Sequence, residues 1–456
     1  MLNVNVIGAG LAGCEAAWQA ASSGVRVTLY EMKPDKKTPA HHSDGFCELV
    51  CSNSLRSAEV TNAGGLLKEE LLRMGSLVME AAMATRVSAG GALAVDRHRF
   101  SDYVTEKIRN CPLIDVVTRE VTSLDLDGVT VTATGPLTSD ALADEIRRIT
   151  GDRRLYFYDA AAPIVDASTI DMEKAFFASR YGKGTPDYIN CPFTEEEYRA
   201  FHEALTSATT AELHDFEKGD SLKVFEGCMP VEVMAGRGYD TLRYGPMKPV
   251  GIRNPLTDES YYAVVQLRKE NEEGTMYNIV GFQTHLTWGE QKRVFRMIPG
   301  LENAEFLRYG VMHRNTFLDS PSLLGSDYSM REREGLYFAG QMTGVEGYIE
   351  SCASGFVAGV NAARRAAGLG PLTFPDRMMT GAMAEYISTG GPVPGTFQPM
   401  NANFGIVPPP DEKVRGGKKA RAEYYSKRAL ETLEGFTAEL ERSKKEIRQA
   451  IGDRDA

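Results

Sequence analysis

The stretch VNVIGAGLAGCEAAWQAASSGVRVTLYE, residues 4–31, decides the fold. The run 2–7 predicts a short buried strand, 8–13 a glycine turn, 14–23 a helix that ends before Gly24, and 25–30 a second strand. A strand, a helix and a strand in this order predict a βαβ unit with parallel strands. We therefore expect an α/β protein with a Rossmann-like nucleotide-binding domain.

The glycine turn carries the spacing G-x-G-x-x-G directly after the predicted strand. These glycines allow a tight turn, a close approach of the backbone to a pyrophosphate, and close packing of the helix on the strand. An acidic residue about 20 positions further on is placed to accept hydrogen bonds from ribose hydroxyls. The predicted dinucleotide-binding residues are Gly8, Ala9, Gly10, Leu11, Ala12, Gly13 and Glu31.

A second glycine segment, LYFAGQMTGVEGYIESCASGF at 336–356, repeats the order of strand, turn and helix. It favours FAD over NAD as the dinucleotide, because flavoproteins of this fold use a late glycine turn against the flavin end. Gly340, Gln341 and Gly347 are the predicted contacts there. The FAD-binding domain is thus expected to be built from both ends of the chain.

The 456 residues exceed what one hydrophobic core normally serves. Strand-like runs at 113–118, 129–134 and 155–158 predict a second α/β domain inserted into the first. The predicted FAD-binding domain comprises 1–96, 206–245 and 301–456, and the predicted insertion comprises 97–205 and 246–300. Helical spacing also predicts one helix over 63–84, and the run 261–283 predicts a strand pair joined by an acidic Glu/Gly turn. A charged helix closes the chain from Gly417 onward.

Composition narrows the class of protein. A net charge of −11 argues against a surface that binds polyanions everywhere, although a local basic stripe remains possible. The seven cysteines are odd in number and contain no CxxC pair, so we expect reduced thiols, no disulfide framework and no metal site. The opening segment lacks the basic start of a signal peptide, and no stretch reaches the length of a membrane span. We expect a cytoplasmic protein without membrane contact.

Several longer strings carry a resemblance to a known family. They are TPAH (38–41), CSNSL (51–55), AGGALAVDR (89–97), EGCMPVE (226–232), YGPMKPVG (244–251), HRNTF (313–317), FAGQMTGVEGYIESCASG (338–355) and FQPMNANFG (397–405). In this order they resemble the bacterial folate- and FAD-dependent tRNA (uracil-5-) methyltransferase family across almost the whole chain. A paralogous flavoenzyme family that modifies wobble uridines shares the glycine turns, but CSNSL and EGCMPVE fit the methyltransferases better.

The resemblance implies a specific reaction, the formation of 5-methyluridine in the T loop of tRNA. Uracil C5 is a poor nucleophile, so a thiolate adds to C6, methylenetetrahydrofolate supplies the carbon, a base removes the C5 proton, and FAD reduced by NAD(P)H supplies the hydride. The cysteines that match the family strings are Cys228, implied as the nucleophile, and Cys51, implied as the base. From the residues alone, two buried and unreactive thiols are the more common outcome. Cys191 is expected to be structural.

Substrate contacts are expected from charged and aromatic side chains. Arg97 and Arg314 are candidates for a folate glutamate tail or an RNA phosphate, and His313 for the pterin or a proton transfer. Five cations in 413–421, Lys418 and Lys419 among them, are candidates for RNA phosphates, with a solvated helix start as the alternative. A ribosomal RNA uracil as target, or a flavin-bound RNA-binding protein without turnover, are the rival functions. No stable protein partner is expected.

Overall fold

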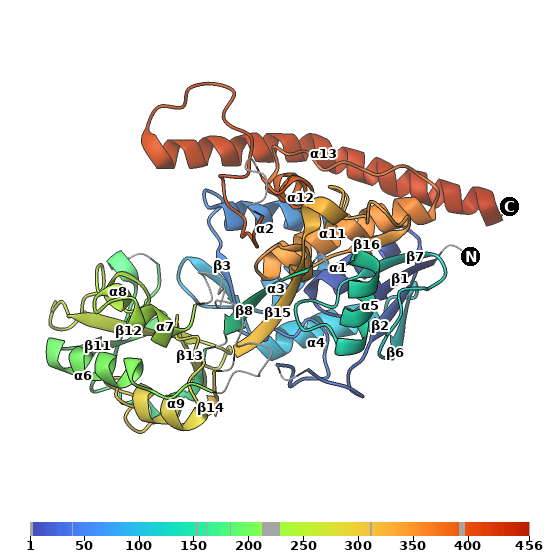
Figure 1. The fold of residues 1–456 in the computed structure, drawn as a ribbon. Helices are drawn as coiled ribbons and strands as arrows, with labels where there is room; N and C mark the ends of the chain where they lie inside the picture. The colour runs from blue at the N-terminus through green and yellow to red at the C-terminus, as the bar shows by residue number, and fades with distance from the viewer. Residues whose placement is uncertain are drawn as a thin grey trace.

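A five-stranded parallel sheet lies in the right-hand part of Figure 1. The computed structural model describes residues 3–38, 40–151, 154–160, 162–182, 184–211, 229–310, 312–391 and 397–455, without the side chains of 154–160, 312–316 and 454–455. The strands are β1 (Asn3–Ile7), β2 (Arg26–Glu31), β6 (Ile114–Thr118), β7 (Val129–Thr132) and β16 (Leu336–Phe338), in the order β16-β7-β1-β2-β6. All four pairings are parallel. The α/β class and the Rossmann-like sheet are confirmed, with β16 from the late glycine segment beside β7.

Two helices rich in small residues pack on this sheet. Helix α1 (Leu11–Ser22) follows the first glycine turn, and α11 (Tyr348–Ala366) follows the second. A Cβ atom added to Gly355 would lie 2.2 Å from the carbonyl oxygen of Ala12, and one added to Gly359 would lie 2.5 Å from that of Ala16. The backbones of α1 and α11 therefore meet directly, which brings the two glycine turns together.

The helix expected over 63–84 is two helices, so that prediction was wrong. Helix α2 (Ala63–Arg73) ends before Gly75, whose φ is +85°, and α3 (Leu77–Ala84) begins after Ser76, whose side chain accepts from the amide of Met79. A left-handed glycine followed by an N-cap serine breaks a helix even where apolar spacing continues. The closing helix was predicted correctly: α13 (Gly417–Asp455) runs along the top of Figure 1, over α2 and α11.

A second core surrounds a six-stranded sheet of order β10-β11-β12-β13-β9-β14. Its elements are β9 (Ile164–Asp166), β10 (Phe176–Ala178), β11 (Tyr188–Phe193), α6 (Glu195–Thr206), α7 (Val231–Gly236), α8 (Thr241–Tyr244), β12 (Ala263–Lys269), β13 (Met276–Ile279), α9 (Trp288–Phe295) and β14 (Phe306–Arg308). Every pairing in it is antiparallel. The strand pair predicted within 261–283 is β12 and β13, so that prediction is confirmed.

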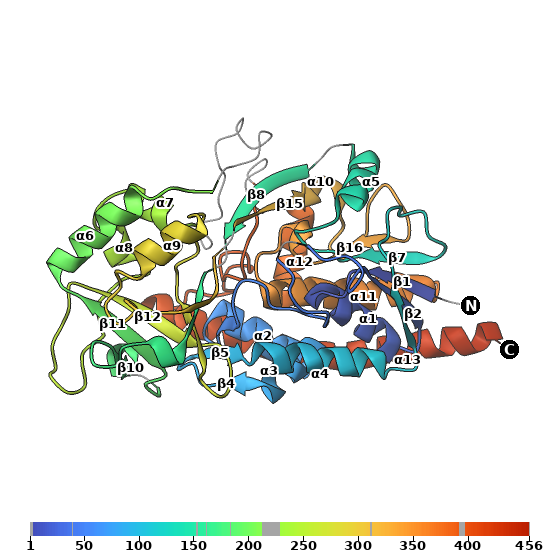
Figure 2. The same ribbon diagram turned by 90° about the horizontal axis from the view of Figure 1, so that it is seen from below.

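Two antiparallel strands join the second core to the first. Strand β8 (Arg154–Ala160) leads out and β15 (Met312–Leu318) leads back, and the pairing runs from Met312 with Ala160 to Leu318 with Arg154. This ribbon lies between the two cores in Figures 1 and 2.

The remaining elements complete the first core. They are β3 (Ser54–Ser57), β4 (Arg86–Val87), β5 (Ala92–Val95), α4 (Arg97–Arg109), α5 (Asp140–Thr150), α10 (Ser320–Leu323), α12 (Met379–Thr389) and a short 3-10 turn at 341–343. Two further 3-10 turns, at 167–169 and 180–182, belong to the second core. Buried apolar side chains cluster from 4–146 with 318–447, and separately from 165–304. The strand-like runs at 113–118 and 129–134, from which the inserted domain was predicted, are instead β6 and β7 of the parallel sheet, where β6 pairs with β2 and β7 with β1. The five-part division of the chain into domains remains a prediction, because clusters of buried side chains describe packing and not domain boundaries.

Candidate active site

The turn after β1 is shaped by its glycines. Gly8 has a φ of +96°, and a Cβ atom on Gly13 would stand 1.8 Å from the carbonyl oxygen of Gly8. At Gly10, by contrast, an added Cβ atom meets nothing within 4 Å. Gly10 is therefore not required by the packing of the protein against itself. The open space above it, at the N-terminus of α1, suits a phosphate group.

Glu31 lies at the end of β2 and reaches back to this turn. The amide of Ala9 donates to Glu31 Oε2 at 2.8 Å, and the amide of Lys33 donates to Oε1 at 3.0 Å. The residue is 8% exposed. Two amides thus hold the carboxylate in one orientation and leave it lone pairs for ribose hydroxyls. The expected proximity of turn and carboxylate is present, and their contact with a cofactor remains a prediction.

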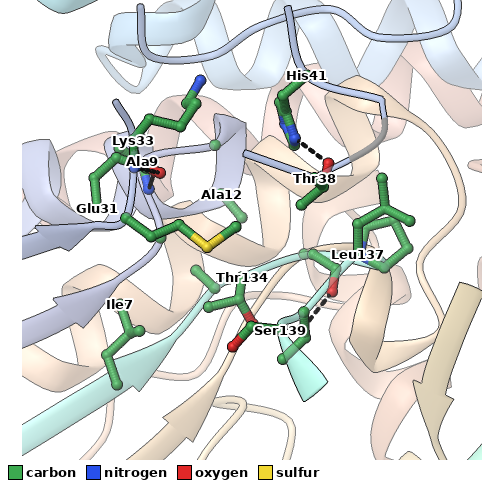
Figure 3. A pocket seen from close by; sticks show the side chains of 18 of the residues that line it. Ile7, Ala9, Ala12, Glu31, Lys33, Thr38, His41, Thr134, Leu137 and Ser139 are labelled. Carbon is green, nitrogen blue, oxygen red and sulfur yellow. Dashed lines mark hydrogen bonds between the residues drawn. The ribbon is translucent and has the colours of Figure 1, made fainter. Parts of the chain in front are cut away.

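A cleft with an open volume of about 1120 Å³ runs along these residues (Figure 3). The turn residues 8–12 line it on one side and residues 133–139 on another, and Gly340 and Gln341 line its far part. Figure 3 shows Ala9 beside Glu31. The cleft therefore offers a carboxylate, amides at a helix N-terminus and a second glycine turn, which fit the ribose, the pyrophosphate and the flavin of FAD.

The second turn also requires its glycines. Gly340 has a φ of +84°, and its amide donates to Ser354 Oγ at 2.7 Å. A Cβ atom on Gly340 would lie 3.1 Å from the Ala12 side chain. Gly347, with a φ of +122°, directly precedes α11. These positions keep the backbone of the second turn close to the first.

His41 forms part of the cleft wall. Its Nδ1 lies 2.5 Å from the Thr38 hydroxyl, a contact drawn in Figure 3. Burial, together with the Lys33 ammonium, lowers the pKa of His41. A neutral imidazole therefore faces the cleft near neutral pH, and the Lys33 ammonium itself donates to the Gly45 carbonyl.

Cys51 lies where Val50 and Tyr348 line the cleft. The Cys51 amide donates to the Tyr348 hydroxyl oxygen at 2.8 Å, and Cys51 Sγ lies 2.9 Å from the same oxygen, where either atom can donate. Burial, followed by the charge of the neighbouring Cys51, raises the pKa of Tyr348 well above its ordinary value. Tyr348 is therefore a neutral phenol that can donate a hydrogen bond to a thiolate.

Two arginines hold the residues that precede Cys51. Arg97, the first residue of α4, donates to the carbonyl of Leu49, and Arg308 at the end of β14 donates to the carbonyl of Val50. Cys51 lies close enough to both guanidiniums for a negative charge on its sulfur to stabilise their positive charges. Cations beside a cysteine favour the thiolate, which is the reactive form.

Glu270 from the second core fixes the first of these arginines. Its Oε2 lies 2.7 Å from Arg97 Nη2, and the Glu270 side chain is 1% exposed. Arg97 is thus committed to Glu270 and to a backbone carbonyl. Its predicted contact with folate or RNA remains a prediction.

The residues after Cys51 are held by the second core as well. Arg268 on β12 donates to Ser52 Oγ at 2.6 Å and to Asn53 Oδ1 at 3.1 Å. The Asn53 amide group donates to the carbonyls of Val95 and Lys269. The CSNSL loop is therefore clamped between the two cores.

The other predicted catalytic cysteine, Cys228, lies outside the described residues. The described chain on either side of it is anchored to one stretch. The amide of Ala211 donates to the carbonyl of His285 at 2.9 Å, and the amide of Val231 donates to that of Gln283 at 2.7 Å. The distance between Cys228 and Cys51 therefore remains untested.

The predicted substrate residues are distributed over two regions. His313 and Arg314 lie on β15, opposite Asp159 and Tyr158 of β8, and their side chains are outside the description. Lys418 on α13 lines a groove whose open volume is about 1240 Å³. Lys419 is exposed and lies 3.9 Å from Glu423.

This groove has an aromatic wall. The rings of Phe404 and Tyr425 stack at 5.3 Å with an angle of 16°, and Arg421 lines the groove beside them. Cations and stacked rings suit a nucleic acid strand. That contact remains a prediction.

The described cysteines 14, 47, 51, 111, 191 and 352 are all free. Cys191 is fully buried, and burial raises its pKa, which agrees with the structural role expected for it. Among the residues that the structure describes, no cluster of His, Cys, Asp and Glu is arranged to hold a metal ion. No helix in the described ranges is long and apolar enough to cross a membrane.

Sequence reasoning missed Tyr348, Arg268, Glu270 and Arg308. Each reaches the CSNSL loop or its arginine from a distant part of the chain: Tyr348 is 297 positions from Cys51, and Arg308 is 258 from Val50. Local spacing carries no signal for such contacts. The only hint in the sequence was that Tyr348 directly follows Gly347 within the family string at 338–355.

Comparisons with known proteins match the chain over most of its length. A family model described as glucose inhibited division protein A matches residues 3–370. The methylenetetrahydrofolate--tRNA-(uracil-5-)-methyltransferase TrmFO of Brevibacillus brevis is 57% identical over 436 residues, covering 96% of this chain and 98% of the relative. The protein of the same name from Anoxybacillus flavithermus is 58% identical over 439 residues, covering 96% and 100%.

The fold is also found in solved structures. GidA from Aquifex aeolicus, in its form II crystal, superposes with a TM-score of 0.70 at 18% identity, over 99% of this chain and 75% of that one. The form I crystal gives a TM-score of 0.67. At this level of identity the likeness establishes the shared fold.

Proposed function

Since this chain belongs to the methylenetetrahydrofolate--tRNA-(uracil-5-)-methyltransferase family, within the wider glucose inhibited division protein A family, we propose that it converts a uridine of tRNA into 5-methyluridine. The carbon donor is methylenetetrahydrofolate, and the reductant at the reaction centre is FAD in its reduced form. The uridine lies in the T loop.

One observation of the structure carries the proposal. Cys51 contacts Tyr348, and Tyr348 lines the same cleft as Gly340 and Gln341 of the second glycine turn, so the thiol and the phenol would stand beside a flavin bound there. A flavoenzyme that only transfers hydride does not require a cysteine on a loop that three arginines hold. A reaction that must also remove a proton from C5 has a use for a thiolate base at this place.

Cys228, Cys51 and Tyr348 have separate roles in the reaction. The Cys228 thiolate adds to uracil C6, which turns C5 into a nucleophilic carbon. Cys51 removes the C5 proton, and the hydrogen bond from Tyr348 keeps its sulfur in place and stabilises it while it is anionic. Once C5 has bonded to the methylene carbon of the folate, loss of the C5 proton would expel tetrahydrofolate. Hydride delivery to that carbon would then expel the Cys228 thiolate from C6 and restore the C5–C6 double bond of the uracil.

The bound groups supply the remaining parts. FAD, when bound and reduced, supplies the hydride that completes the methyl group. FAD would be held by the open space at Gly10 and by the fixed carboxylate of Glu31. Gly340 and Gln341 would contact its flavin end, with Gly347 shaping the same turn. NAD(P)H reduces the flavin, and the reaction takes place in the cytoplasm.

We assign substrate binding to residues in two regions. Arg314 and His313 on β15 contact folate, and Arg97, beside the loop that carries Cys51, contributes its charge. Lys418 and Lys419 bind phosphates of the tRNA along the start of α13.

The test uses RNA from a strain that lacks the gene. Purified protein with FAD, NAD(P)H and labelled methylenetetrahydrofolate should produce labelled 5-methyluridine in tRNA, identified by mass spectrometry of nucleosides. Transfer from labelled S-adenosylmethionine in the absence of folate would overturn the proposal. Label found only in ribosomal RNA would assign the enzyme a different substrate.

A further inference from the structure

Three aromatic rings form a parallel stack at the edge of the second core. The rings of Trp288 and Tyr309 lie 5.5 Å apart at an angle of 12°, and those of Tyr309 and Phe306 lie 5.4 Å apart at 13°. We call this set the aromatic ladder. Trp288 is 63% exposed, while Tyr309 and Phe306 are partly buried. The indole is therefore the open end of the ladder.

The ladder is held rigidly from behind. Gln291, which is fully buried, accepts from the amide of Gly310 at 2.8 Å and donates to the carbonyls of Gly310 and Leu286 at 2.8 and 2.7 Å. One side chain of α9 thus ties the segment before the helix to the residue after Tyr309. A single exposed tryptophan is ordinary on a protein surface. An exposed tryptophan stacked on a clamped ring presents a preorganised flat face.

Position and charge point to the kind of partner. Lys292, which is exposed, follows Trp288 by four residues and so lies on the same face of α9. Arg308, next to Tyr309, contacts Val50 beside Cys51. Helix α9 and β14 are neighbours at the lower left of Figure 1. The aromatic ladder and Lys292 therefore provide a stacking surface and a cation. Tyr309 of the ladder is the neighbour in sequence of Arg308, which contacts the loop that carries Cys51.

We propose that the aromatic ladder is a stacking platform for one unpaired base of the RNA substrate, adjacent to the uridine that is methylated. Every base presents a flat face to such a ring, so this contact holds RNA without reading its sequence. Lys292 binds the neighbouring phosphate. The inference rests on the proposed function, because it takes the partner to be the RNA that the enzyme modifies.

The chain offers its own reporter for the test, since Trp18 and Trp288 are its two tryptophans. In the full-length flavoprotein carrying Trp18→Phe, tryptophan emission comes from Trp288 alone. Titration with a T-arm hairpin RNA should quench this emission in a saturable manner. Filter binding of the same RNA measures affinity independently of activity.

Two variants complete the design. Trp288→Ala should weaken RNA binding by about tenfold, the loss expected for one base stack, and Trp288→Phe should restore most of it. Tyr244→Ala removes an aromatic side chain that is 82% exposed on α8 and should bind RNA like the parent.

The outcomes separate this inference from the proposed function. If the parent binds and methylates the hairpin while Trp288→Ala binds it within twofold of the parent, the platform is overturned and the enzyme's function stands. If Trp288→Ala instead abolishes self-association with RNA affinity unchanged, the ladder is an interface between copies of the chain and the proposal is also overturned. A parent protein that methylates no RNA contradicts the proposed function itself.

Discussion

The Tyr348 hydroxyl lies 2.9 Å from Cys51 Sγ and 2.8 Å from the Cys51 amide nitrogen, although 297 positions separate the two residues. One oxygen therefore holds both the backbone and the sulfur of the predicted base. Because the CSNSL loop has no regular structure at Cys51, this contact and the arginines around it define where the sulfur lies.

Tyr348→Phe removes this hydroxyl and keeps the ring. We expect kcat to fall by about ten- to a hundredfold, the effect of losing a hydrogen bond to a charged sulfur, while FAD content stays unchanged. Single-turnover methylation of tRNA measures the rate. Tyr337→Phe, which removes a buried hydroxyl that donates to the Asn361 carbonyl, is the matched control and should retain the parental rate.

A 5-fluorouridine substrate separates the roles of the two cysteines. Fluorine does not leave C5 as a proton does, so the C6 adduct accumulates wherever the attacking thiolate is intact. Cys228→Ala should lose both activity and the covalent RNA complex, whereas Cys51→Ala should lose activity and still form the complex. Denaturing gels detect it. A complex that survives in Cys228→Ala and disappears in Cys51→Ala, with FAD present in both, would reverse the assignment.

Gly10→Val tests the dinucleotide cleft. A Cβ atom at this position meets no protein atom within 4 Å, so the substitution should leave folding intact and occupy the space of the pyrophosphate. We expect a colourless protein with a parental circular dichroism spectrum and no uptake of FAD. Gly370→Val, also open around its Cβ, is the control and should remain yellow. Normal flavin content in Gly10→Val would place the cofactor elsewhere.

Arg308→Gln removes a cation and the contact with the Val50 carbonyl. The rate at which iodoacetamide alkylates Cys51 at pH 7.5 should fall severalfold, since a nearby cation favours the thiolate. Peptide mass spectrometry assigns the modified cysteine. Arg253→Gln, at an exposed ion pair with Asp258, should not change the rate. An unchanged rate in both variants would show that Arg308 has no influence on the thiol.

Glu70 should make stability depend on pH. Burial raises the pKa of Glu70 from 4.5 to about 7, against the hydrogen bonds that Thr380 and the Met379 amide donate to its carboxylate. Stability from its protonated form is complete below about pH 4.5 and is lost as the pH rises through 7, a change on the order of 3 kcal/mol. Glu70→Gln should remove this slope from urea-unfolding free energies measured at pH 5 and 7. Parallel slopes in both proteins would contradict the assignment.

The sequence predicted the parts of the fold that depend on local pattern. Strands β1 and β2, the glycine turn and α13 follow from spacing that a window of 10 to 20 residues contains. The break between α2 and α3 was missed because apolar spacing continues through Gly75. The antiparallel sheet of the second core was predicted only at β12 and β13. Strands β9, β10 and β14 have three residues each and carry little pattern, and the six-residue β11 was missed as well.

The site was predicted to a similar extent. The glycine turn and Glu31 form one motif, and the motif fixes their proximity. The clamp on the CSNSL loop could not be predicted in this way, because Arg268 and Tyr348 reach it through the tertiary fold. Contacts of this kind depend on how the two cores meet, which no local window contains.

The ribbon of β8 and β15 has a consequence for the order of assembly. Strands β7 and β16 pair in the parallel sheet, although the sequence of the second core lies between them. Closing so long a loop carries an entropy cost, and pairings distant in sequence form slowly. Once the second core has folded and strands β8 and β15 have paired, residues 154 and 318 are neighbours. Only the short segments between β7 and β8 and between β15 and β16 then remain to be closed. The insertion would then hold the two segments close together, and we expect the nucleotide-binding sheet to gain its edge strand β16 last.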